Sequence, residues 1–183
     1  MATRSRGVVA DYLGQPNTLE HGRLYHNEGL GPDGRPRFRD VTREMRFDRA
    51  LLAMGANFGD LDNDGWLDAY FGTGEPRLET LVPNRMFRNA EGKVFQDVTT
   101  AGGFGHLQKG HAIAFGDLDD DGDEDVYAVM GGAYGGDAYK NVLFENPGSA
   151  NAWVELQLEG TLRTARPSAR GYRSFVRTPA GER

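Results

Sequence analysis

Hydrophobic and polar residues alternate over short stretches in the C-terminal half of the chain. Four segments rich in β-branched and aromatic residues are AIAF (112–115), VYAVM (126–130), NVLFE (141–145) and WVELQL (153–158). The last alternates strictly, with apolar side chains at positions 154, 156 and 158. Runs of Gly, Asp, Asn and Pro separate these segments, as is typical of turns. The pattern predicts short antiparallel strands, with little helix beyond one helical turn in 77–83.

The same pattern recurs at a fixed spacing of 57 residues. GANFGDLDNDGWLDAYFG (55–72) aligns with AIAFGDLDDDGDEDVYAV (112–129). The same shift carries MFRN (86–89) onto LFEN (143–146) and FRDVT (38–42) onto FQDVT (95–99). Segments that share one offset indicate a structural repeat.

A four-stranded unit that repeats is the outline of a β-propeller blade. We therefore predict an all-β fold, a partial β-propeller of four-stranded antiparallel blades with about two full blades and part of a third. The expected divisions are a partial first blade (1–52), a second blade (53–110), a third blade (111–162) and a basic, disordered tail (163–183). LYHNEG (24–29) takes the place of MFRNAEG with no Asp-rich loop before it, so the chain is expected to begin inside a repeat. The aromatic residues expected between blades are Phe58, Phe87, Phe115 and Phe144.

Two Asp-rich loops carry the candidate chemistry. The first places carboxylates at loop positions 1, 3, 5 and 9, which are Asp60, Asp62, Asp64 and Asp68. The second places them at Asp117, Asp119, Asp121 and Asp125. Gly65 and Gly122 permit the sharp turn that closes such a loop, and the backbone carbonyls of Trp66 and Asp123 would complete an oxygen cage. Asp120 and Glu124 lie off these positions and are expected to face solvent.

Oxygen-only coordination by four carboxylates favours Ca²⁺ over Zn²⁺ or Cu²⁺. We predict two Ca²⁺ sites, because carboxylates held this close repel each other unless a cation lies between them. Solvated acidic turns are the plain alternative, since Asp-Gly pairs are common hairpin signals. An EF-hand needs a Glu at position 12, where this chain has Phe71 and Ala128. Paired catalytic carboxylates would face each other across a cleft, whereas these are compressed into nine residues.

Composition and charge narrow the function classes. The chain has 183 residues, a formal net charge of −6 and no cysteine, which excludes disulfides and thiolate metal sites. Residues 60–68 and 117–125 hold 11 acidic groups and no Lys or Arg, so the acidity is local. These acidic clusters would repel phosphate, so nucleic acid is not an expected partner. No apolar run is long enough for a membrane span, and the N-terminal residues lack the pattern of a signal peptide.

The segment AFGDLDDDGDEDVY resembles FG-GAP/VCBS repeats, the integrin-α-like propellers whose blades carry DxDxDGxxD calcium loops. The segment NVLFENPGSANAWVELQLEGT looks like proteins that end in an ASPIC/UnbV domain. The resemblance covers roughly residues 8–162. It implies a calcium-stabilised, extracellular or periplasmic module that binds a protein or glycan ligand. The alternative is the non-catalytic propeller portion of a polysaccharide-acting enzyme; we expect no enzymatic activity in this chain, since no catalytic motif is present.

Two features depart from that family. Such propellers close with about seven blades, and closure normally needs at least about four. We therefore expect a fragment, an incomplete gene product or an arc completed by further blades or self-association. The tail TLRTARPSARGYRSFVRTPAGER (161–183) is basic and lacks alternation. A frameshift is one hypothesis, because codons exist for 163–172 whose neighbouring frame reads NRSAIGARI, close to the family's own sequence.

Overall fold

Antiparallel sheets dominate the computed structural model, which describes residues 4–75, 81–132, 135–151, 155–160 and 172–177. The expected β-rich class is confirmed. The described sheets have two, two, four and three strands, and none of them closes on itself. The expected helical turn in 77–83 lies largely outside the described residues.

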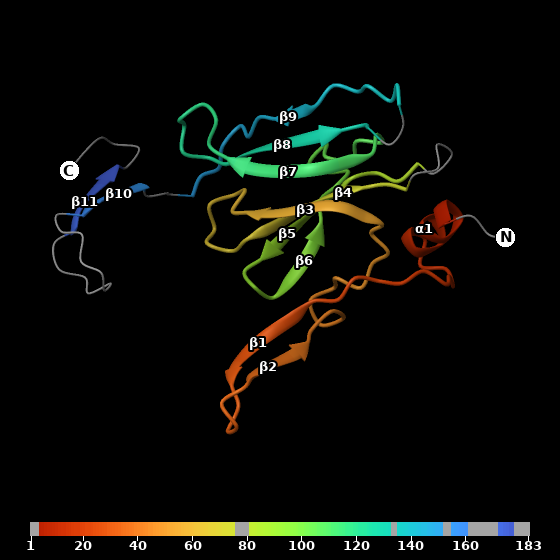
Figure 1. The fold of residues 1–183 in the computed structure, drawn as a ribbon, viewed down its shortest axis with the longest axis horizontal. Coiled ribbons are helices and arrows are strands. Elements are labelled where there is room, and N and C mark those ends of the chain that lie inside the picture. The colour runs from red at the N-terminus through yellow and green to blue at the C-terminus, as the bar shows by residue number, and fades with distance from the viewer. Residues whose placement is uncertain (1–3, 76–80, 133–134, 152–154, 161–171, 178–183) are drawn as a thin grey trace.

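The central sheet is a four-stranded meander. Its strands, in spatial order, are β3 (Ala53–Gly59), β4 (Asp68–Thr73), β5 (Arg85–Ala90) and β6 (Val94–Asp97). A three-stranded meander follows, with β7 (Gly110–Gly116), β8 (Asp125–Met130) and β9 (Val142–Phe144). These two sheets lie face to face, with the hairpin of β1 (Tyr25–Leu30) and β2 (Pro36–Asp40) beyond the central sheet (Figure 1).

Within the central sheet, β4 and the first half of β5 are buried on both faces, and apolar side chains occupy both faces of these two strands. Ala69, Phe71 and Phe87 face a first apolar cluster, to which the segment after β2 contributes Phe47 and Leu51. The second cluster lies between the central and three-stranded sheets. Its buried members are Tyr70, Met86, Ile113, Val126, Ala128 and Met130.

Three of the four aromatic residues expected between sheets lie in these clusters. Phe87 is buried in the first, and Phe115 and Phe144 pack against the second. Phe58 is half exposed, so the expectation for it was wrong. Phe58 lines a cleft together with Leu24 and Trp66, so part of its ring borders open space and not a packed neighbour.

Glycines let the two larger sheets approach closely. A Cβ built on Gly55 would lie 1.4 Å from the carbonyl oxygen of His111, and one on Gly72 would lie 2.6 Å from the carbonyl carbon of Gly110. Backbone therefore meets backbone where β3 and β4 contact β7, and no larger residue fits at either position.

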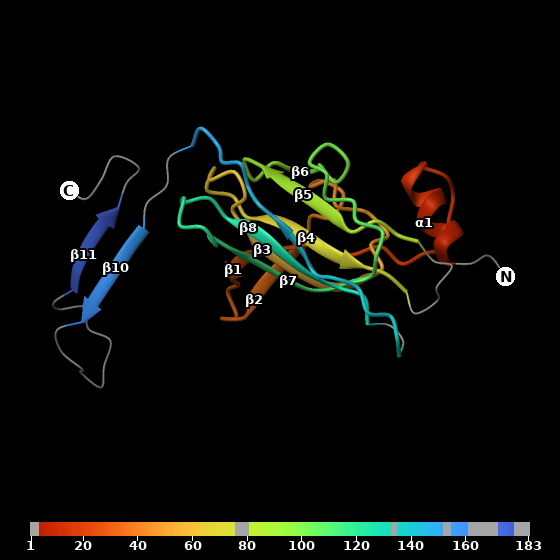
Figure 2. The same ribbon diagram turned by 90° about the horizontal axis from the view of Figure 1, so that it is seen from above.

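Two elements differ from the expected blades. The segment expected to complete the third blade contributes β10 (Glu155–Gly160), which pairs with β11 (Tyr172–Arg177) in a separate hairpin (Figure 2). β11 thus lies in the tail for which no regular structure was expected. Near the N-terminus, α1 (Arg4–Tyr12) is a helix that the strand pattern did not predict. It is the one helix among the described residues, and nothing there has the length and apolar character needed to cross a membrane.

Candidate metal centres

The two Asp-rich loops occupy the same place in successive sheets. Loop A (residues 60–68) joins β3 to β4, and loop B (residues 117–125) joins β7 to β8. Loop A folds around Asp60, whose carboxylate accepts hydrogen bonds from the backbone N–H groups of Asp64 (3.0 Å) and Gly65 (2.9 Å). Asp64 in turn accepts one from the N–H of Trp66 at 2.9 Å.

Loop B repeats these bonds 57 residues later. Asp117 accepts from the N–H groups of Asp121 (3.1 Å) and Gly122 (2.9 Å), and Asp121 accepts from Asp123 (3.0 Å). The backbone matches as well, since positive φ values occur at the fourth and sixth positions of both loops. They are 54° at Asn63, 87° at Gly65, 62° at Asp120 and 95° at Gly122. The left-handed conformation explains why Asn, Asp and Gly stand there.

The ninth residue of each loop links the start of its loop to an asparagine further along the chain, Asn89 in β5 for loop A and Asn146 just after β9 for loop B. Asp68 accepts from the N–H groups of Leu61 (3.1 Å) and Asn89 (2.7 Å). Asp125 accepts from those of Leu118 (3.2 Å) and Asn146 (2.8 Å). Burial raises the pKa of Asp68 to about 6. A carboxylate this desolvated needs positive charge or N–H donors around it.

Three carboxylates converge in each loop. One oxygen from each of Asp60, Asp62 and Asp64 lies within 4.8 Å of the other two, and the same holds for Asp117, Asp119 and Asp121. Asp68 and Asp125 are not members of these groups. Oδ1 of Asp62 is buried and has no hydrogen-bond partner within the described chain. Each group therefore has the oxygen chemistry of a hard divalent cation site.

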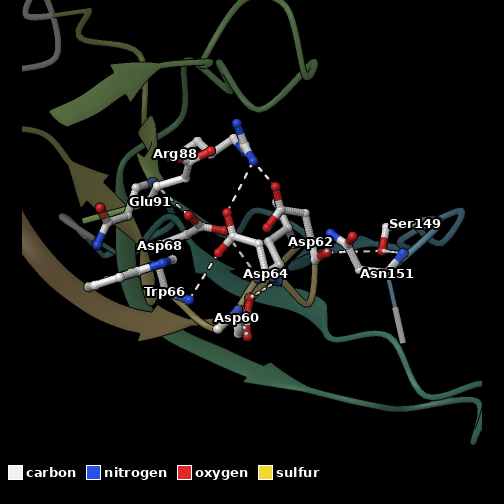
Figure 3. A network of polar contacts seen from close by, with 12 residues as sticks. Asp60, Asp62, Asp64, Trp66, Asp68, Arg88, Glu91, Ser149 and Asn151 are labelled. Carbon is white, nitrogen blue, oxygen red and sulfur yellow. Dashed lines mark hydrogen bonds and ion pairs between the residues drawn. The ribbon is translucent and has the colours of Figure 1, made fainter. Parts of the chain in front are cut away.

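The two loops differ in one nearby charge. The Arg88 guanidinium on β5 pairs with Asp62 and, at 3.1 Å, with Asp64 (Figure 3). The residue 57 positions later is Glu145. Among the described residues, no Lys or Arg forms an ion pair with loop B. There, desolvation together with the charges of Asp121 and Asp125 raises the pKa of Asp119.

Loops A and B also touch each other. The Asp60 N–H donates to Oε2 of Glu124 at 2.7 Å, and the Asn63 amide donates to the Gly122 carbonyl at 3.2 Å and to Asp123. Glu124 is half buried by this contact, so the expectation that it faces solvent was wrong, whereas Asp120 is exposed as expected.

The segment after β9 completes this contact. Asn146 donates to the Leu61 carbonyl at 2.7 Å, and Ser149 and Asn151 donate to the Asp62 carbonyl at 2.9 and 2.8 Å (Figure 3). These contacts, like that of Arg88, were missed by the sequence analysis, although Asn89 and Asn146 share the 57-residue offset.

Metal coordination by the backbone carbonyls of Trp66 and Asp123 stays a prediction. Trp66 is half exposed, and its ring lies against Gly92. Asp123 is buried, and its carboxylate accepts from Asn63.

A cleft lies beside Trp66 and Leu67 of loop A. It has a volume of about 430 Å³, and its lining includes Leu24, His26, Glu44, Phe58 and Trp66. Apolar rings beside a few polar groups are typical of a binding cleft.

No family model matches the chain, and no curated protein sequence matches it. The resemblance to FG-GAP/VCBS repeats therefore rests on the motifs alone.

Proposed function

We propose that the chain is a calcium-binding module in which loops A and B each hold one structural Ca²⁺. The observation that supports this most strongly is the repetition of one loop geometry, because both copies turn three carboxylates toward a common point. The donor set is composed of oxygen atoms, which Ca²⁺ accepts in flexible geometries. The proposed ligands are the aspartate side chains at positions 1, 3, 5 and 9 of each loop, with the backbone carbonyls of Trp66 and Asp123 at position 7.

Electrostatics explains why a cation would stabilise the fold. Two unit charges about 5 Å apart repel by about 3 kcal/mol at an effective dielectric of 20, and solvent lowers that figure. Each loop holds three such charges within a small space. A bound Ca²⁺ would replace this repulsion by attraction, and it would fix the turn that joins two strands of each sheet.

Isothermal titration calorimetry with CaCl₂, combined with thermal unfolding in EDTA and in Ca²⁺, tests the proposal. We expect two sites and a higher Tm in Ca²⁺. Asp62→Asn and Asp119→Asn should each remove one site, because each changes one ligand of one loop. Asp33→Asn is the control, since Asp33 lies in an exposed turn between β1 and β2. Absence of binding, or equal loss of affinity in the control, contradicts the proposal.

We further propose that these stacked sheets are part of an integrin-α-like propeller of the FG-GAP/VCBS type that works outside the cytoplasm. The 57-residue recurrence of strands and loop bonds supports this architecture. Extracellular calcium modules have dissociation constants of about 10⁻⁴–10⁻³ M, which suits exposed loops such as loop B. Such a module would serve interaction or adhesion.

The cleft beside loop A is the proposed place of that interaction. Trp66 and Phe58 offer aromatic surface there, with His26 and Glu44 as polar groups. This combination fits a glycan, whose rings stack on aromatic faces while their hydroxyls form hydrogen bonds. A glycan array probed with the wild type and Trp66→Ala tests it; signals that Trp66→Ala leaves unchanged would place the interaction elsewhere.

A further inference from the structure

The outer face of the three-stranded sheet repeats a face that is buried elsewhere in the molecule. In the central sheet, Tyr70 and Met86 are fully buried against the three-stranded sheet. The residues 57 positions later are Tyr127 and Leu143, which lie side by side on β8 and β9. They are 39% and 50% exposed. With Ala114 on β7, they form an uncovered row that we call the back face.

The hairpin of β1 and β2 exposes a face that corresponds to the other side of the central sheet, the side that bears Phe87 and Phe95. Its register places Tyr25 opposite Asp40 and Asn27 opposite Phe38. The β5–β6 pair has the same register, with Phe87 opposite Asp97 and Asn89 opposite Phe95. Phe87 and Phe95 are buried, whereas Tyr25 and Phe38 are 57% and 61% exposed. We call the surface of Tyr25 and Phe38 the front face.

At two positions the central sheet has glycine where the three-stranded sheet has a larger residue, and this difference limits which kind of sheet can pack on the back face. The central sheet has Gly55 and Gly72 where it meets the backbone of β7. The equivalent residues of the three-stranded sheet are Ala112 and Val129. Their side chains would keep out a neighbouring sheet that has an inner strand like β7. A two-stranded sheet such as β1–β2 has no strand in that place and meets no such obstacle.

We propose that the back face of one copy binds the front face of a second copy. Tyr25 and Phe38 of one molecule would pack on Ala114, Tyr127 and Leu143 of the next, continuing the stacking seen within the chain. Because the two faces differ, the contact is head-to-tail and propagates into a ring or a short filament. This association goes beyond the proposed metal binding and does not depend on it.

Sedimentation velocity of the 183-residue chain over a wide range of protein concentration, in Ca²⁺ and in EDTA, tests the proposal. The wild type should form species larger than a monomer. Tyr127→Lys removes the back face and Phe38→Lys removes the front face, so each variant alone should be monomeric. An equimolar mixture of the two should form a dimer and nothing larger, because one intact interface remains.

Leu107→Lys is the matched control, since Leu107 is 56% exposed and belongs to neither face. It should associate like the wild type. Leu143→Lys and Tyr25→Lys repeat the test on each face, and circular dichroism verifies that each variant is folded. A monomeric wild type, a back-face or front-face variant that dimerises on its own, or a mixture that stays monomeric would overturn the proposal. Failure of calcium binding would leave these outcomes unchanged.

Discussion

A single residue sets the difference in charge between the two loops. Arg88 already pairs with two of the three clustered carboxylates of loop A, while Glu145 stands at the equivalent position beside loop B. A guanidinium competes with a metal ion for the same oxygens. Loop B should therefore bind Ca²⁺ more tightly than loop A.

Replacing Arg88 by glutamine should raise the calcium affinity of loop A. The side chain is 38% exposed, so solvent reduces its Coulomb energy, and we expect a gain of roughly five- to tenfold. Calorimetry in an Asp119→Asn background isolates loop A. The mirror variant Glu145→Arg, measured in an Asp62→Asn background, should weaken loop B. A lower affinity in Arg88→Gln would instead mean that Arg88 positions the ligands.

The surroundings of Asp48 predict that the stability of the fold depends on pH, independently of the metal loops. His21 bridges Asp11 of α1 at 3.0 Å and Asp48 at 2.7 Å. The hydrogen bond from His21, with help from Arg43, lowers the pKa of Asp48. Because the folded pKa lies below the unfolded value of about 3.9, the carboxylate stabilises the fold above that pH and loses this effect as the pH falls.

Asp48→Asn should therefore lower the urea midpoint at about pH 5 and converge with the wild type in acid, near the folded pKa. Urea titrations at a series of pH values provide the measurement. Asp33→Asn, in an exposed turn, should follow the wild-type curve throughout. A constant offset between Asp48→Asn and the wild type at all pH values would assign the effect to packing instead.

At the scale of the residue, the sequence was a good guide to the loops and a poor one to their surroundings. The spacing of Asp60, Asp62 and Asp64 encodes convergence locally, because alternate side chains of one turn share a side. Arg88 is 24 residues from Asp64 and reaches it only because β5 pairs with β4. Such a contact depends on sheet pairing, which residue spacing does not specify.

At the scale of the element, the stacking of sheets depends on glycine in two strands. Gly55→Ala would place a methyl group 1.4 Å from the carbonyl oxygen of His111, so β3 and β7 would have to separate. Overpacking of this kind costs about 1–3 kcal/mol, and backbone is less able than a side chain to move away. We expect a loss of at least about 2 kcal/mol in the free energy of unfolding.

Gly116→Ala is the matched control for that prediction. Gly116 also lies in a strand, but a Cβ there would meet no atom within 4 Å and its φ is not in the left-handed region. Chemical denaturation should therefore show a change within about 1 kcal/mol of the wild type, with the sign favouring Ala. Equal effects at the two positions would mean that strand propensity, and not sheet contact, is being measured.

Strand positions were predictable because alternation reports which side chains share a face. The pairing of β10 was not, because an alternating segment is compatible with any neighbour that offers a free edge. The helix α1 was missed since nine residues give a weak helical pattern. Its signals were Val8 and Asp11, buried on one face, and Gly14 just beyond its end with φ of 66°.

At the scale of the molecule, the 57-residue offset predicted the succession of similar sheets. Hydrogen bonds in both loops and from both Asn89 and Asn146 recur at that spacing. Closure into a propeller depends on the number and tilt of all the sheets in the ring. A sequence repeat predicts only that neighbouring sheets stack in the same way. Tyr127 on the three-stranded sheet and Phe38 on the β1–β2 hairpin are both exposed, so the outermost of these stacked sheets each leave an aromatic side chain uncovered.

The contacts between loops A and B predict that their metal sites are coupled, if both bind Ca²⁺ as proposed. Asn63 of loop A donates to Gly122 and Asp123 of loop B, and Glu124 of loop B accepts from the N–H of Asp60. An ion that orders one loop therefore fixes groups that hold the other. The second ion then binds to a partly ordered site, which gives positive cooperativity.

Coupling is measured by comparing each single-site affinity, in Asp62→Asn and Asp119→Asn, with the two affinities of the wild type. We expect the product of the two association constants of the wild type to exceed the product of the two single-site association constants by roughly fivefold, which corresponds to a typical coupling free energy of about 1 kcal/mol. Asn63→Gly should reduce the excess, because it removes the bridging amide, leaves the bond from the Asp60 N–H to Glu124 in place and keeps a residue that accepts φ of 54°. Asp120→Gly makes the same change at the equivalent, exposed position of loop B, and it should keep the excess even if its calcium affinity falls. Additive binding in the wild type, or loss of coupling in both glycine variants, would show that the two loops bind independently despite their contact.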